Sequence, residues 1–84
     1  MPVTSAQLRM ARAALNWTVR DLAEATGLHR NTITNIEIGR YAGEEKSLER
    51  IETVLGKAGV DFIDENGGGP GVRLRKPARE KPRK

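Results

Sequence analysis

Two short helices joined by a tight turn are predicted for residues 19–38, VRDLAEATGLHRNTITNIEI, and this segment constrains the fold more than any other. The inner side of the predicted pair is made of small and apolar residues at helical spacing: Leu22, Ala23, Leu28, Ile33 and Ile36. Ala23 lets two helix backbones approach closely, and Gly27 can adopt the left-handed conformation that ends a helix. We therefore expect two helices that cross tightly around Gly27.

The second helix of this pair has a polar outer face, formed by Arg30, Asn31, Thr34 and Asn35. Arg matches guanine O6 and N7, and Asn matches adenine N6 and N7, each contact giving about 1–3 kcal/mol of base discrimination. A solvated helix face would also be polar. Thr and Asn have poor helix propensity, however, and a recognition role explains their presence better than local folding does. The pattern favours a DNA-reading helix-turn-helix motif.

Composition excludes several classes of protein. At 84 residues the chain forms one small domain of marginal stability, which a partner subunit would help to stabilise. Without Cys and with His29 as the single His, neither a disulfide framework nor a metal site is expected, and we expect no cofactor. No nucleophile with a base can be assembled, so we expect no enzyme. No membrane-spanning or signal segment is present, and we expect a cytoplasmic protein.

Positive charge is concentrated towards the two ends of the chain, whose net charge is +4. Residues 1–43 carry +2 and residues 67–84 carry +6, whereas residues 44–66 carry −4. DNA would be attracted to the first and last of these segments and repelled by the middle one. For the acidic segment, a solvated face turned away from DNA is favoured over a docking surface for a basic partner protein.

Capping signals predict the remaining helices. Thr4 and Gln7 form a capping box before a helix at about residues 5–15, and Thr18 with Asp21 caps the helix at residues 19–26. The recognition helix is expected to begin near His29 or Arg30 and to stop at Gly39. Ser47 is the expected N-cap of a fourth helix that ends at Gly59.

Beyond Gly59 the periodicity changes to that of a β-hairpin around the turn ENGGGPG. An isolated hairpin is marginal in water, so it must pack on the helices or extend into a sheet with another subunit. Its expected dimerisation residues are Val60, Phe62, Val72 and Leu74. The Pro-containing basic end, residues 76–84, is expected to be disordered; it either solubilises the protein or tracks DNA phosphates.

The motifs together resemble the phage-repressor-like, or Xre, helix-turn-helix family. The resemblance covers about residues 6–58 and rests on these positions: Leu22-Ala23, Gly27-Leu28, Ile33, Ile36-Glu37 and Gly39. It implies a mainly α fold, a four- to five-helix repressor-like domain, here followed by the hairpin and the basic tail. It also implies that the third helix docks in the DNA major groove, usually as part of a two-fold dimer on a near-palindromic operator.

The resemblance also implies roles for individual residues. The base-contacting positions are Arg30, Asn31, Thr32 and Asn35. The phosphate-contacting positions are Thr18, Arg20, His29, Arg40 and Tyr41. Arg12 and Glu37 occupy the positions of a salt bridge that braces the first helix against the third.

Four positions need separate interpretation. Many members have Gln where this chain has Val19, so we leave Val19 out of the contacts. His29 stands where Ser or Thr is commoner, and it is expected to be a poorer helix cap. Trp17 is expected to pack in the core at the junction of the first two helices. Tyr41 is compatible with either loop packing or a phosphate contact.

We therefore expect three parts: a helix-turn-helix domain at residues 1–59, a hairpin at residues 60–75 and the tail at residues 76–84. The expected function is that of a sequence-specific, homodimeric transcriptional repressor whose partner is double-stranded DNA. Either the hairpin or the fourth helix would join the subunits. The alternative is an antitoxin-type module that neutralises a partner protein and autoregulates its own promoter.

Overall fold

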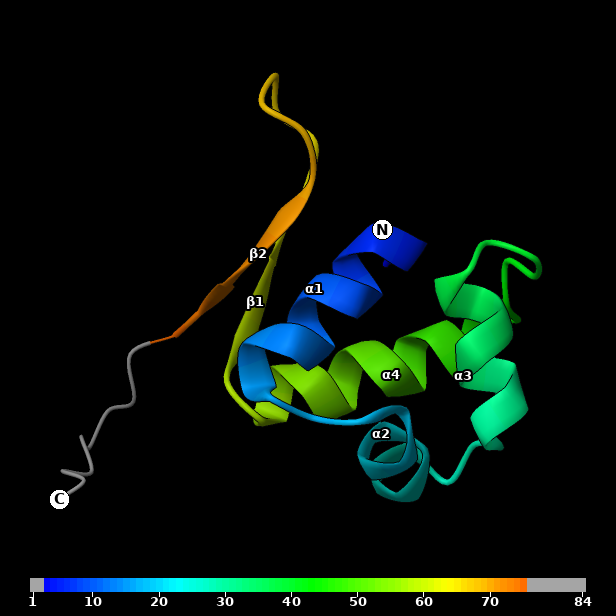
Figure 1. Cartoon of the computed structure of the whole chain (residues 1–84). Coiled ribbons are helices and arrows are strands. Elements are labelled where there is room, and N and C mark those ends of the chain that lie inside the picture. Colours follow the sequence, from blue (N-terminus) through cyan, green and yellow to red (C-terminus); the bar gives the residue numbers. More distant parts are fainter. Residues whose placement is uncertain (1–2, 76–84) are drawn as a thin grey trace, which may run out of the picture.

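The computed structural model describes residues 3–75 and contains four helices followed by a hairpin (Figure 1). Helix α1 spans Ser5–Leu15, α2 Val19–Thr26, α3 Arg30–Glu37 and α4 Glu45–Lys57; strand β1 spans Val60–Ile63 and β2 Gly71–Leu74. The predicted mainly α fold with a C-terminal hairpin is confirmed. None of the helices in the described residues is long and apolar enough to cross a membrane. The predicted tail, residues 76–84, lies outside the described residues.

The first two helices begin and end where their capping signals predict. The Thr4 hydroxyl accepts a hydrogen bond from the Gln7 N–H at 3.0 Å, and the Gln7 side chain accepts one from the Thr4 N–H at 3.1 Å. Thr18 and Asp21 repeat this arrangement at the start of α2. Helix α2 ends at Gly27, whose φ of +78° is the left-handed conformation that a residue with a Cβ adopts at a cost.

Helix α4 begins earlier than the sequence predicts. Its N-cap is Glu44, which makes no side-chain capping bond, and Ser47 lies inside the first turn of the helix. The negative charge of Glu45, the first residue of the helix, is favourable at a helix N-terminus. In the preceding loop Gly43 has a φ of +91°, and a Cβ on it would lie 3.1 Å from Ile36, so this position favours glycine.

The core lies where the four helices meet and contains two buried apolar side chains from each of α1, α2 and α3 and three from α4. Its largest fully buried side chains are Leu8, Leu22, Ile33, Ile51, Leu55 and Val60. Burying each such side chain is worth about 1.5–3 kcal/mol, so the core is the main source of stability. Trp17 packs against this core from the α1–α2 junction, as the sequence predicts.

The hairpin packs its apolar side on the helices of its own subunit. Strands β1 and β2 pair antiparallel, with Val60 opposite Leu74 and Phe62 opposite Val72. Phe62 and Val72 pack against the core, and Val60 is 1% exposed. The Val60 side chain, one of the expected dimerisation residues, is thus already buried within the chain itself. The turn between the strands projects beyond the helices (Figure 1).

One buried side chain connects the hairpin to the start of α1. The Gln7 amide nitrogen donates hydrogen bonds of 3.0 Å to the backbone oxygens of Ile63 and Gly71. Gln7 is 2% exposed, and its oxygen is already engaged in the capping box of α1. The same residue thus caps a helix and holds together the end of the hairpin next to its turn.

Candidate nucleic-acid interface

Helix α3 presents polar side chains on the side opposite its buried residues. Ile33, Ile36 and Glu37 are buried, whereas Arg30, Asn31 and Thr34 are exposed. Thr32 and Asn35, two of the residues expected to contact bases, are half-buried. Sequence reasoning placed Thr34 on the outer face but left it out of the base-contacting set. Its spacing of three and four residues from Asn31 and Arg30 places it in the same exposed row.

His29 caps α3 despite being an unusual residue for that role. Its ring Nδ1 accepts a hydrogen bond of 3.0 Å from the backbone N–H of Asn31. Because Nδ1 acts as the acceptor, the neutral ring carries its proton on Nε2. The side chain is exposed, so Nε2–H is the donor that remains for an external partner.

The starts of α2 and α3 lie side by side around two shallow depressions. One has a volume of about 420 Å³ and is lined by Thr18, Val19, Arg20, Arg30, Asn31 and Thr34. The other is lined by Arg20, Ala23, Glu24, Gly27, Leu28, His29 and Arg30. Arg20 and Arg30 line both. Arg20 and Arg30 thus lie at two helix N-termini, where the positive ends of the helix dipoles attract anions and the Asp21 carboxylate opposes them.

Arg20 is held only weakly within the protein. Its Nε lies 3.6 Å from Glu24 Oε2, one turn further along α2, and both side chains are more than 70% exposed. Exposed pairs of this kind contribute little to stability. A phosphate can therefore replace Glu24 as the partner of Arg20 at small cost.

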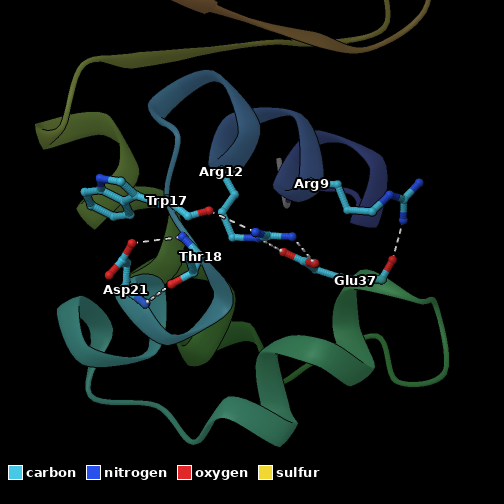
Figure 2. A network of polar contacts seen from close by, with 6 residues as sticks. All are labelled: Arg9, Arg12, Trp17, Thr18, Asp21 and Glu37. Atoms are coloured by element: carbon cyan, nitrogen blue, oxygen red, sulfur yellow. Dashed lines mark hydrogen bonds and ion pairs between the residues drawn. The ribbon is translucent and has the colours of Figure 1, made fainter.

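A partly buried ion pair braces α3 against α1 behind this surface (Figure 2). Arg12 Nε lies 2.7 Å from Glu37 Oε2, and Arg12 Nη2 lies 3.0 Å from Glu37 Oε1. Arg12 also donates to the backbone oxygen of Trp17 at 2.9 Å, and Arg9 donates to the backbone oxygen of Glu37. The hydrogen bonds that Arg12 donates to the Glu37 carboxylate raise the pKa of Arg12 above its ordinary value, so the guanidinium stays charged.

The model of a helix-turn-helix family matches residues 8–62, which include all four helices from Leu8 onward and most of β1. The chain belongs to the Xre-type helix-turn-helix family. It is therefore a DNA-binding transcription regulator of the Xre type. No curated protein matches the chain.

Two of the residues expected to contact phosphate lie apart from the others in this Xre-type protein. Arg40 and Tyr41 follow the C-terminal end of α3, and their backbone N–H groups both donate to the Asn35 oxygen, at 3.0 and 3.2 Å. Tyr41 lines a separate depression beside the N-terminal residues Val3 and Thr4. The structure thus brings Thr18, Arg20 and His29 to the start of α3, and leaves Arg40 and Tyr41 at its other end.

Proposed function

We propose that this protein is a dimeric repressor that occupies a near-palindromic operator, with α3 in the major groove. The exposed row of Arg30, Asn31 and Thr34 opposite the buried Ile33 and Ile36 carries the proposal. Arg and Asn side chains have the paired hydrogen-bonding groups that distinguish guanine and adenine. Because Thr32 and Asn35 are half-buried, they would contribute through their exposed atoms at the edges of this row.

Phosphate contacts would fix the position of α3 on the duplex. Thr18, Arg20 and His29 surround the helix N-termini and would contact one stretch of backbone. Arg40 and Tyr41 would contact the backbone beyond the other end of α3. Such contacts add affinity without sequence information, so their loss should weaken binding to operator DNA and to random DNA alike.

The outer edge of β2 is our proposed subunit interface. The backbone N–H of Arg75 donates to the Gly59 oxygen at 2.7 Å, so these two residues form a hydrogen-bonded pair. Hydrogen-bonded and non-hydrogen-bonded pairs alternate along antiparallel strands, which makes Val60–Leu74 and Phe62–Val72 non-hydrogen-bonded pairs. The backbone groups of Val72 and Leu74 therefore point away from β1, and they have no hydrogen-bond partner within residues 3–75. Leu74 is 50% exposed. An edge of this kind can pair with β2 of a second copy, which would complete the operator-binding dimer.

Selection of bound sequences from a random DNA pool, at a stated salt concentration, tests the proposed function. We expect two related half-sites whose centres are about 34 Å apart, one turn of DNA. Replacing Arg30 or Asn31 with Ala should relax the preference at one base position in each half-site. If the native protein selects no preferred DNA sequence from the pool, operator recognition is refuted.

Leu74→Pro tests the interface, with Leu74→Ala as its control. Both variants replace the Leu74 side chain with a smaller one, but only Pro also removes the outward backbone N–H that a second strand needs as a hydrogen-bond donor. We expect Leu74→Pro to sediment as a monomer and Leu74→Ala to remain a dimer. A dimeric Leu74→Pro protein would exclude this edge and favour α4 as the interface.

A further inference from the structure

One apolar side chain lines the otherwise polar depression between the start of α2 and the outer side of α3. That residue is Val19, which packs partly against the core but is only half-buried. Capping does not explain an apolar residue here, because Thr18 and Asp21 already make both capping bonds of α2. Val19 therefore offers an apolar surface within the proposed base-reading site.

The neighbours of Val19 indicate what this surface would contact. Thr34 is exposed on α3, lines the same depression and adds a second methyl group. Arg30 and Asn31 also line it, so any base that they read lies close to these methyl groups. In the major groove, thymine presents a C5-methyl group to apolar side chains, whereas cytosine presents an amino group and no methyl.

We infer that Val19, with Thr34 beside it, contacts the C5-methyl group of one thymine in each half-site. Val19 thereby selects thymine over cytosine at a position next to the bases read by Arg30 and Asn31. The inference rests on the proposed function, because it requires α3 in the major groove. Burial of a single methyl group corresponds to about a fourfold change in affinity.

The test replaces each thymine of the selected operator, one at a time, with deoxyuridine, which lacks only the methyl group. Binding is measured for the native protein, for Val19→Ala and for Val54→Ala. Val54 is a matched control, because it is also a half-buried Val packed on the core but lines a depression formed by α4 alone. We expect deoxyuridine at one thymine of each half-site to weaken binding of the native protein and of Val54→Ala about fourfold. Binding of Val19→Ala should weaken clearly less than fourfold there, because only the Thr34 part of the methyl contact is left to lose.

Two results would overturn the inference while leaving operator recognition intact. One is that no deoxyuridine weakens native binding, or that the selected half-site has no fixed thymine. The other is an equal loss for native and Val19→Ala proteins at every thymine. A native protein that selects no DNA sequence would instead refute the proposed function, and this inference with it.

Discussion

Arg12 and Glu37 form a two-bond ion pair that holds the recognition helix against α1 (Figure 2). The two partners differ in exposure, since 24% of the Arg12 side chain and 7% of the Glu37 side chain are accessible. The pair lies at the C-terminal end of α3, away from Arg30 and Asn31. It should therefore affect DNA binding by fixing the orientation of α3.

We expect Arg12→Met to destabilise the fold more than Glu37→Met. The first leaves a buried carboxylate without its partner, whereas the second leaves a guanidinium that still reaches water and the Trp17 oxygen. The expected loss for Arg12→Met is about 2–3 kcal/mol in the free energy of unfolding, measured with urea. The double variant should regain part of this loss, because two apolar residues leave no buried charge. Strictly additive losses would show that the pair is not coupled.

Gln7→Glu should loosen the hairpin but keep the cap of α1. Glu preserves the acceptor that the capping box needs, but it places a carboxylate against the oxygens of Ile63 and Gly71. We expect faster hydrogen exchange at the amides of Ile63 and Gly71, the pair beside the Gln7 contact, and little change within α1. Protonating the new Glu at low pH should restore part of the protection. Uniform acceleration across all helices would indicate general unfolding instead.

Asp61 makes the hairpin sensitive to acid. Hydrogen bonds from Arg75, at 2.7 Å, and from Arg73, at 3.2 Å, lower the pKa of Asp61 below its ordinary value of 3.8. A lowered carboxyl pKa stabilises the fold above about pH 4, and the stabilisation is lost as the pH falls through the folded-state value. Titration of the Asp61 carboxyl by NMR should give a midpoint below 3.8 in the native protein. Arg75→Met should raise this midpoint more than Arg73→Met does, and the reverse order would contradict the assigned bonds.

Deleting the basic residues 76–84 tests whether this segment contacts DNA. The deletion removes five Lys or Arg residues and one Glu. If the segment tracks phosphates, operator and random DNA should both bind more weakly, and affinity should depend less steeply on salt. Binding isotherms at several salt concentrations give that slope. An unchanged slope would leave the segment with a solubilising role only.

Local signals predict much of this fold because they act within a few residues. The capping boxes at Thr4 and Thr18 each need side chains only three positions apart, and the start of α1 and of α2 follows from them. Gly27 ends α2 through its own conformational freedom. The apolar spacing on α2 and α3 likewise indicates which sides of these helices are buried.

Only the tertiary structure decides the features that depend on distant residues. Gln7 bonds to oxygens 56 and 64 positions away, and Gly43 lies where a Cβ would crowd Ile36 and Leu48. The half-burial of Thr32 and the partial exposure of Val19 are set by how α2 and α3 cross. A sequence specifies its own helix ends through short-range hydrogen bonds, whereas burial depends on which surfaces meet once the chain is folded. That distinction determines which outward residues of this regulator are available to read DNA.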